Sequence, residues 1–395
     1  MRDTAHPVDF DLTPEQLELR DRVRAYADDV LAPLAGGWDR AGRVDDPAPL
    51  DALAGMGLHG LCLPREHGGG GATVLDAVLC IEQLARVSSL CAVGVFESNV
   101  GPAQVVARFG TEEQRRRFLE PVCRGELQMS VSMTEPEHGS DLTDLETRGE
   151  LRDGEVHIDG LKAPTGGGGE SGAYLVYCRL ADVPGARGIG GVIVERDAPG
   201  LTFEPYPEYM GFRGIPVAAL RFEDCRVPEE NVVLRPGQFA ALMECFNIER
   251  CGNTAAALGL ATGALEHAVA FARERTTWGR PICERGAVQQ MVADMATRVD
   301  AARLLTYRAA TVAEGGAGAV KEVSMAKLFA NETAKAVTDM AMEIMGVRGH
   351  RVDHPVERLL RDSRAWPIAG GTLQIQRLTI ASAVFGRRFD QRAPG

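Results

Sequence analysis

A single long helix is predicted for residues 239–275, FAALMECFNIERCGNTAAALGLATGALEHAVAFARER, because apolar side chains recur there at helical spacing. Four of them fall on one stripe of that helix: Leu242, Cys245, Ala256 and Leu260. Glu249 falls on the same stripe, where a core side chain is expected. A carboxylate in such a position must be paired, have a shifted pKa or take part in chemistry. Glu249 is therefore a candidate functional residue.

The sequence around this helix divides into three regions. Residues 286–315 and 321–346 predict two more long helices of a C-terminal bundle. The region before residue 128 is also helical: Thr13 is followed by Pro14 and Gln16, a capping box with proline at the first helical position. Residues 73–90, TVLDAVLCIEQLARVSSL, predict another helix of this region.

The middle region has short segments rich in β-branched residues, bounded by Gly, Pro or Asp: 155–163, 173–180, 189–196 and 217–227. Helices, then strands, then helices predict an α+β fold rather than alternating βαβ units. We expect an N-terminal helical domain at 1–127, a central β-domain at 128–235 and a C-terminal helical bundle at 236–395.

Composition excludes several classes of function. The chain has 395 residues and a net charge of -12, which argues against a nucleic-acid partner. We find neither a secretory signal nor an apolar run as long as a membrane span. Nine cysteines without CxxC pairs fit a reducing, cytoplasmic compartment and no metal site. Residues 167–172, GGGESG, match GxGxxG, but the strand-like AYLVYCRL follows, so we expect a flexible hairpin loop and no Rossmann fold.

Three separated strings resemble signatures of the acyl-CoA dehydrogenase family. VSMTEPEHGSDL, residues 131–142, resembles its TEP-x-x-GSD motif, and RTTWGRPI, residues 275–282, resembles its R-x-x-FG-x-x-I stretch. VERLLRDSRAWPIAGGTLQIQR, residues 356–377, resembles its ER-x-x-RD…GT-x-x-IQR ending. Their order and spacing agree from about residue 13 to 385.

This resemblance implies a helical domain, a central β-barrel-like domain and a C-terminal four-helix bundle, with FAD between the last two. It implies a homotetramer or homodimer in which a neighbouring subunit covers the adenine end. Members oxidise a saturated acyl thioester to the enoyl thioester: a glutamate removes the α-proton while a hydride goes to flavin N5. The developing enolate oxygen needs hydrogen-bond donors, and the base needs a desolvated site that raises its pKa.

The position of the base departs from the commonest pattern. Most members carry it in a YEGT loop, which here reads Ala369, Gly370, Gly371 and Thr372. A minority carry the base in a Glu-Arg pair on the first long helix of the bundle, with a small residue in the loop. Glu249 and Arg250 match that pair, so the resemblance implies Glu249 as base, with Arg250 bracing the loop. The alternative is a buried structural ion pair. The backbone N–H of Gly370 is implied as a donor to the thioester oxygen.

The resemblance also assigns flavin contacts. Met133 and Thr134 are expected along the flavin ring, and Gly139 and Ser140 near the pyrophosphate. Thr372 and Gln374 are expected at its other end. Arg275, Thr277, Trp278 and Gly346 are expected at the FAD of a neighbouring subunit, since a cationic fork suits a diphosphate.

One segment departs from the flavin-binding pattern. The W-I-T/S string that backs the flavin and bonds N5 reads Pro164, Thr165 and Gly166 here. Thr165 and Gly166 are still expected at the cofactor, but the N5 hydroxyl is absent unless Thr165 slides by one place. Weaker FAD binding is expected, and ordinary β-oxidation with electron-transfer flavoprotein as acceptor becomes one candidate only.

The sequence thus predicts an FAD-dependent acyl-thioester dehydrogenase with a dedicated biosynthetic or catabolic role. Similar proteins act on carrier-protein-bound units, so the substrate is an acyl-CoA or an acyl-carrier-protein thioester, the latter typical of secondary metabolism. The alternatives are a flavin monooxygenase or oxidase on the same fold, and a non-catalytic scaffold without flavin.

Overall fold

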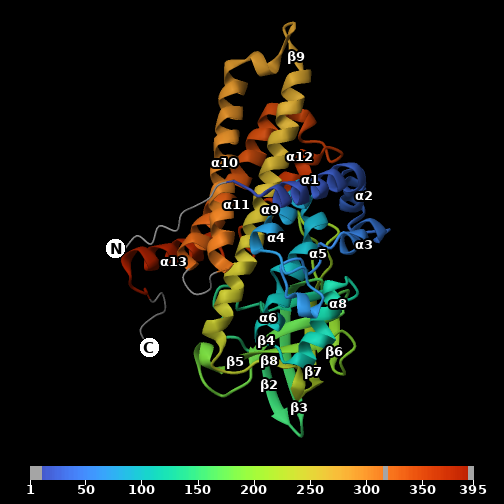
Figure 1. Ribbon diagram of the computed structural model, residues 1–395, viewed down its shortest axis with the longest axis vertical. Helices are drawn as coiled ribbons and strands as arrows, with labels where there is room; N and C mark the ends of the chain where they lie inside the picture. The colour runs from blue at the N-terminus through green and yellow to red at the C-terminus, as the bar shows by residue number, and fades with distance from the viewer. Residues whose placement is uncertain (1–10, 315–318, 390–395) are drawn as a thin grey trace.

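The computed structural model describes residues 11–314 and 319–389, and is an elongated molecule with helices above a β-region (Figure 1). The N-terminal region contains α1 (Pro14–Tyr26), η1 (Ala27–Leu31), α2 (Ala32–Ala41), α3 (Ala48–Gly55), η2 (Arg65–His67), α4 (Val74–Ala85), α5 (Ser89–Asn99), α6 (Pro102–Phe109), α7 (Glu112–Gln114), η3 (Arg115–Leu119) and α8 (Glu120–Cys123). The capping box at Thr13 forms as predicted, with the side chains of Thr13 and Gln16 bonded to each other's backbone N–H.

The helix predicted over 73–90 is divided in two by the structure. Thr73 caps α4 together with Asp76, and α4 ends at Ala85. Ser88 then accepts a hydrogen bond from the N–H of Leu90 and starts α5. Ser88 and Ser89 therefore begin a second helix instead of ending the first. The Ser88 hydroxyl, at the N-cap, accepts from a backbone N–H that would otherwise have no partner.

The strands form one twisted sheet in the order β6-β7-β3-β2-β4-β5-β8, with β1 beside β4. Their bounds are β1 Met129–Ser132, β2 Arg148–Arg152, β3 Glu155–Gly166, β4 Ala173–Arg179, β5 Ile189–Glu195, β6 Leu201–Pro205, β7 Val217–Pro228 and β8 Val232–Leu234. Residues 167–172 join β3 to β4, which are separated in the sheet by β2. This segment is therefore not a hairpin. It is held in place by the Tyr174 hydroxyl, which accepts from Gly169 N–H at 2.9 Å and donates to Gly167 O at 3.2 Å.

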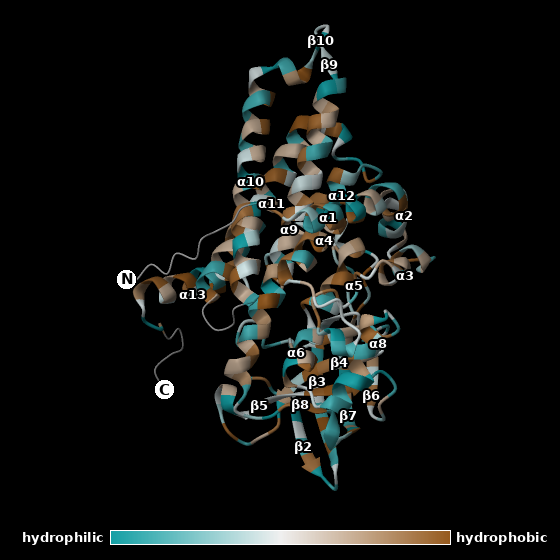
Figure 2. Cartoon of the chain, in the orientation of Figure 1, coloured by the Kyte–Doolittle hydropathy of each residue, from teal (hydrophilic) through white to brown (hydrophobic). Residues whose placement is uncertain are grey.

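The C-terminal bundle is built on α9 (Phe239–Glu274), which runs the length of the molecule's helical part (Figure 1). It is followed by β9 (Thr276–Thr277), β10 (Arg280–Pro281), η6 (Ile282–Glu284), α10 (Gly286–Glu314), α11 (Val320–Met345), η7 (Gly346–Arg348), α12 (Pro355–Asp362) and α13 (Leu373–Phe385). Figure 2 shows apolar residues concentrated where these helices face one another, and α13 standing away from the body.

Three glycines let α9 approach the N-terminal helices closely. A Cβ on Gly252 would lie 2.5 Å from the side chain of Val100, the residue that follows α5. A Cβ on Gly259 would lie 2.4 Å from the carbonyl oxygen of Glu82, and one on Gly263 would lie 2.2 Å from that of Arg86. These distances are far inside van der Waals contact, so a side chain at any of these positions would force its neighbours to shift where α9 crosses α4 and α5.

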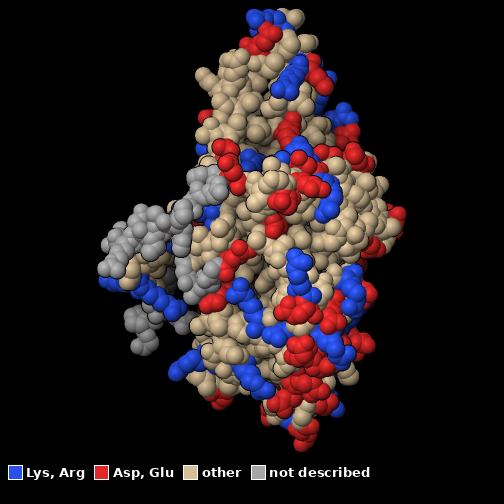
Figure 3. All heavy atoms as spheres, viewed as in Figure 1, with Lys and Arg blue, Asp and Glu red and all other residues tan. Residues whose placement is uncertain are grey.

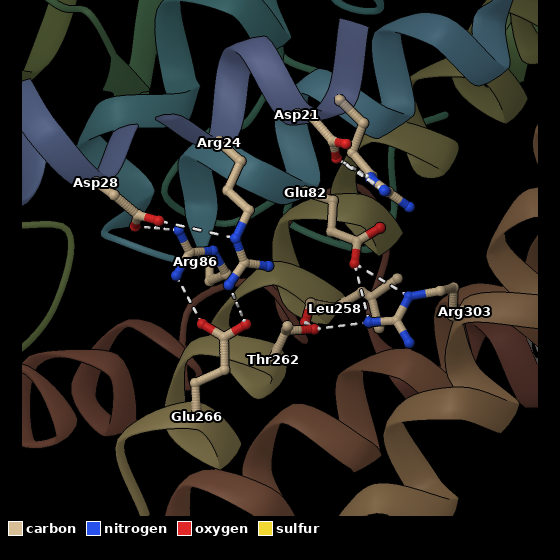
Figure 4. Close-up of polar contacts among 10 residues, drawn as sticks. Asp21, Arg24, Asp28, Glu82, Arg86, Leu258, Thr262, Glu266 and Arg303 are labelled. Atoms are coloured by element: carbon tan, nitrogen blue, oxygen red, sulfur yellow. Dashed lines mark hydrogen bonds and ion pairs between the residues drawn. The ribbon is translucent and has the colours of Figure 1, made fainter. Parts of the chain in front are cut away.

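Charged groups reinforce the same contact (Figure 4). Arg86 pairs with Asp28 and with Glu266, the latter at 2.6 Å. Glu82, 1% exposed, accepts from Arg303 at 3.1 Å and from the Tyr307 hydroxyl at 2.9 Å. The network joins α4 to α9 and α10. On the outer face in Figure 3, basic and acidic side chains are interspersed, with acidic ones gathered at the end of the β-region.

The expectation about membrane spans needs a correction. Two stretches, Ser89–Phe109 and Phe239–Glu274, are long and apolar enough to cross a membrane. Of their most apolar windows, however, 78% and 67% are buried inside the protein, which is the behaviour of core helices.

All nine cysteines are free thiols.

The network around Glu82 generates a prediction for stability. Glu82→Ala leaves the Arg303 guanidinium and the Tyr307 hydroxyl without their acceptor, and should lower the free energy of unfolding by about 2–3 kcal/mol. The matched control is Glu332→Ala, which removes an ion pair with Arg377 whose side chains are both over 40% exposed. It should cost at most about 1 kcal/mol. Chemical unfolding monitored by circular dichroism checks both, and equal losses would contradict the assignment.

Candidate active site

Glu249 lies opposite the loop between α12 and α13. A Cβ built on Gly370 would lie 3.7 Å from Glu249 Oε1, so the helix position and the loop position face one point. Among the described residues, none forms a hydrogen bond or an ion pair with the Glu249 carboxylate. The partner that a structural ion pair at Glu249 would require is therefore not found in this part of the chain.

Burial raises the pKa of Glu249, while the charges of Arg250 and Lys327 act in the opposite direction. The carboxylate is thus destabilised by desolvation but kept available by two cations. This is the balance that a general base needs in order to take a weakly acidic proton.

The loop before α13 is fixed through its carbonyl groups. Arg250 Nε donates to Gly370 O at 3.2 Å, and Asn253 Nδ2 donates to Trp366 O at 3.0 Å. The Lys327 ammonium donates to Ala369 O. Across residues 11–314 and 319–389, no protein acceptor is assigned to the backbone N–H of Gly370. The loop is therefore held by its carbonyl groups, while the Gly370 N–H has no protein acceptor in this part of the chain.

Lys327 is fully buried, and burial together with Arg250 lowers its pKa from 10.5 to about 7. Its Nζ would lie 3.1 Å from a Cβ on Gly370, whose φ is +65°. A side chain at position 370 would thus meet Lys327 and a strained backbone. The glycine fits an arrangement in which the acid comes from α9.

A second carboxyl group, Glu97 on α5, lies near the first. Burial raises its pKa from 4.5 to about 8, and the charge of Glu249 adds to the shift. Phe96 and Val100, one residue before Glu97 and three residues after it, lie against Gly252 of α9. The end of α5 therefore packs on α9 about one turn beyond Glu249.

Comparison with known proteins follows the same three regions. Sequence models of the acyl-CoA dehydrogenase N-terminal, middle and C-terminal domains match residues 13–126, 130–225 and 239–385. This chain belongs to the acyl-CoA dehydrogenase family. Members are oxidoreductases that act on CH–CH bonds, and the chain is an enzyme of this class.

Individual relatives differ in the reaction that their names give. The chain is 36% identical to a 3-sulfinopropanoyl-CoA desulfinase of Paraburkholderia xenovorans, over 97% of this chain and 99% of the relative. The structure matches butyryl-CoA dehydrogenase from Megasphaera elsdenii with a TM-score of 0.92 and 30% identity, covering 96% and 100% of the chains. It also matches the prolyl acyl carrier protein oxidase AnaB, with a TM-score of 0.89 and 26% identity over 95% and 100%.

The family's flavin segment after β1 is held by a buried ion pair. Lys162 is fully buried and its Nζ donates to Glu135 Oε1 at 2.7 Å and to Met133 O at 2.9 Å. Thr134 O accepts from Ala163 N–H at 3.0 Å. The backbone of Met133 and Thr134 is thus fixed against β3. Gly139 and Ser140 follow on an exposed loop, and a Cβ on Gly139 would meet nothing within 4 Å.

The Pro164–Gly166 segment ends β3. Thr165 is 1% exposed, and its hydroxyl bonds Ser132 Oγ at 2.9 Å. A Cβ on Gly166 would meet nothing within 4 Å. The Thr165 hydroxyl thus has a protein partner, whereas open space lies beside Gly166.

The remaining expected contacts lie at two ends of the bundle. Thr372 accepts from Ile375 N–H as the N-cap of α13, and Gln374 is exposed on its first turn. Arg275 ends α9, roughly 39 Å from Glu249 at about 1.5 Å of rise per residue. Thr277 and the 91% exposed Trp278 follow it.

Gly346 lies at the same end as Arg275. It caps α11, and Arg348 two residues later stacks on Phe271, in the last turn of α9, with 5.6 Å from Cζ to the ring centroid. The structure therefore brings Gly346, Arg275, Thr277 and Trp278 to one end of the bundle and does not bring them to Glu249.

Sequence reasoning missed four residues of the site: Glu97, Lys162, Asn253 and Lys327. Glu135 stood inside a quoted motif, but its partner Lys162 is 27 positions away and is brought to it only by the sheet. Asn253 and Lys327 lie on buried faces of α9 and α11, where a polar residue in an apolar pattern was the available signal.

Glu97 generates a prediction for pH dependence. Because its pKa is raised in the folded state, the folded protein holds a proton that the unfolded chain releases above an ordinary pKa of 4.5. Stability should therefore fall as pH rises from about 5 to about 8, and then level off. Glu97→Gln removes this contribution, so its thermal unfolding temperature should fall less than that of the wild type over this range. An identical pH dependence in the two proteins would contradict the shift.

Proposed function

We propose that this enzyme dehydrogenates an acyl thioester between its α- and β-carbons, with Glu249 as the base. One observation carries the proposal: Glu249, unpaired among the described residues and with a raised pKa, faces the Gly370 position at which most relatives place their glutamate. The acid lost from the loop is thus replaced from the helix. The free Gly370 N–H on the same side supplies a donor for the thioester oxygen.

We infer FAD as the cofactor, and the residues present fit it. Open space beside Gly139 and Gly166 leaves room for a bound group along the segment that Lys162 and Glu135 fix. Met133, Thr134 and Ser140 would hold its flavin and pyrophosphate portions, with Thr372 and Gln374 at the other side. Bound FAD supplies the hydride acceptor.

The chain's own residues perform the proton chemistry. Glu249 takes the α-proton. The positive charges of Arg250 and Lys327 offset the cost of burying the negative charge of its carboxylate. Arg250, Asn253 and Lys327 hold the loop so that Gly370 N–H stays aimed at the oxygen where negative charge develops. The loop's rigidity matters because a preorganised donor pays no reorganisation cost at the moment of reaction.

The far end of the bundle supports a homo-oligomer. Met133 shares a hydrophobic cluster with Phe239, Leu242 and Phe246 at the start of α9. Arg275 and Trp278 lie at the other end, so they cannot serve the same flavin and would meet that of a neighbouring copy. Exposed apolar residues on α13, including Phe385 at 72% exposure, offer further contact surface. A homotetramer or homodimer satisfies both features.

We extend this proposal to a dedicated biosynthetic or catabolic role, and to a substrate that is a thioester on a carrier protein. A second candidate is an oxidase on the same fold, which Gly166 favours because it offers no hydroxyl at the N5 position. The similarity to a prolyl acyl carrier protein oxidase agrees with a carrier-protein substrate and with an oxidase. Aerobic turnover with stoichiometric hydrogen peroxide would identify an oxidase, whereas turnover only with electron-transfer flavoprotein would identify a dehydrogenase.

Glu249→Gln tests the base. The variant keeps shape and hydrogen bonding but cannot accept a proton, so anaerobic flavin reduction by a thioester substrate should slow by roughly 10²–10⁴-fold. FAD content and thioester binding should stay close to wild type. The matched control is Glu244→Gln on the same helix, whose carboxylate pairs with Arg108 and should not affect the rate. Near-wild-type reduction by Glu249→Gln would rule Glu249 out.

Arg275→Ala tests the shared cofactor site. Loss of hydrogen bonds to a diphosphate should weaken FAD binding by roughly 10- to 100-fold, with little effect on unfolding of the apoprotein. Arg280→Ala is the control, because Arg280 is in the same exposed loop and pairs with Glu284. Fluorescence titration with FAD measures both. Equal affinities for the two variants, or a colourless wild-type monomer in excess FAD, would contradict the assignment.

A further inference from the structure

Phe212 lies in the segment between β6 and β7 and has a backbone conformation that its side chain disfavours. Its φ is +59°, in the left-handed region where bulky side chains are uncommon and glycine is preferred. The neighbouring backbone is pressed against the end of α12, since a Cβ on Gly211 would lie 2.7 Å from the carbonyl group of Arg361. A strained residue persists only where its surroundings fix it. The phenyl ring at position 212 therefore calls for an explanation.

The last two residues of α12 fix this segment of the β-domain. The side chain of Asp362 is 1% exposed and accepts from Phe212 N–H at 2.8 Å. It also accepts from the N–H of Ser89, the first residue of α5, at 3.1 Å. Arg361 donates to Met210 O at 2.8 Å. The segment is thus attached to helices of both other domains.

The Phe212 ring contacts Trp366, in the loop that leads to Gly370. The two ring centroids lie 5.0 Å apart, with an interplanar angle of 65°. Trp366 is buried, and its indole N–H donates to Ser89 Oγ at 3.0 Å. Its carbonyl oxygen accepts from Asn253 Nδ2 of α9, also at 3.0 Å. Phe212 thus packs on a side chain whose backbone is bonded to the helix that carries the base.

A short turn connects Trp366 to Gly370. The carbonyl oxygen of Ala365 accepts from Ile368 N–H at 3.0 Å and from Ala369 N–H at 3.2 Å. Because the turn is closed by these bonds, a displacement of Trp366 is passed on to Gly370.

We propose that Phe212 is a positioning residue, which through Trp366 keeps the Gly370 N–H aimed at the thioester oxygen. This inference rests on the proposed function and adds a role for the β-domain in holding the loop. It also accounts for the strain: a glycine at position 212 would adopt the same φ freely, but it would have no ring to place on Trp366. A donor that is fixed in advance acts mainly where negative charge develops, so the rate of the chemical step should depend on Phe212 more than binding does.

The experiment measures anaerobic flavin reduction in FAD-loaded enzyme with saturating butanoyl-CoA. Phe212→Leu keeps an apolar side chain but loses the ring contact, and the limiting rate should fall roughly 10- to 100-fold. The Kd values for FAD and butanoyl-CoA should stay close to wild type. Phe212→Gly relieves the strained φ and should be slowed similarly, so the slowing does not reflect poor folding. Phe212→Tyr keeps the ring and should retain the rate.

Phe203→Leu is the matched control. Phe203 is also half-buried and lies in the β-domain, but its ring contacts Tyr174, at 5.7 Å between centroids. This variant should leave the limiting rate unchanged. Near-wild-type rates in Phe212→Leu and Phe212→Gly would overturn the inference. So would equal slowing by Phe203→Leu, slowing by Phe212→Tyr as large as by Phe212→Leu, or a change in the Kd of butanoyl-CoA alone.

Hydrogen exchange tests the same contact without turnover. The amides of Ile368 and Ala369 should exchange roughly 10-fold faster in Phe212→Leu than in wild type or Phe203→Leu, because the turn opens more often. Unchanged exchange would overturn the inference even if reduction slowed. Faster exchange in an enzyme whose wild-type flavin is not reduced by any thioester would overturn the proposed function, and with it the catalytic role of Phe212, but not its hold on the loop.

Discussion

The cost of keeping the Glu249 carboxylate in the interior is the constraint on which the arrangement of the site depends. The side chain is partly buried, and it has no hydrogen-bond partner among the described residues. Two cations offset the cost from one side only. Both are also committed to the loop before α13, Arg250 through Gly370 O and Lys327 through Ala369 O. The same groups that make the acid tolerable therefore also shape the backbone opposite it, so the Glu249 carboxylate and the Gly370 N–H are positioned together.

The constraint extends along α9. Beyond Glu249, α4 and α5 pack tightly on the helix at Gly259 and Gly252. The charged network of Glu82, Arg86 and Arg303 then fixes these helices to the bundle. Stability and chemistry thus share one element: the helix that carries the acid at one end is also the core of the bundle, and it ends in the exposed segment that holds Arg275.

Most of the architecture was predictable from residue patterns. The capping box at Thr13, the strands at 155–163 and 217–227 and the long helix from Phe239 are local features, and local spacing predicts them. The break between α4 and α5 was missed because the apolar period continues through Arg86, and only the hydroxyl of Ser88 marks the new start. In the site, Glu249 was identifiable because it interrupts an apolar stripe. Glu97 and Lys327 were not, since their meaning arises only when α5 and α11 are brought to α9 in three dimensions.

The three close contacts of α9 have a mechanical consequence. A side chain at position 259 or 263 would meet a backbone carbonyl oxygen, and one at position 252 would meet the side chains of Phe96 and Val100. Rotation of α9 about its own axis would bring residues that carry side chains to these contacts and so create steric clashes. The direction in which Glu249 faces is therefore set by packing further along the same helix.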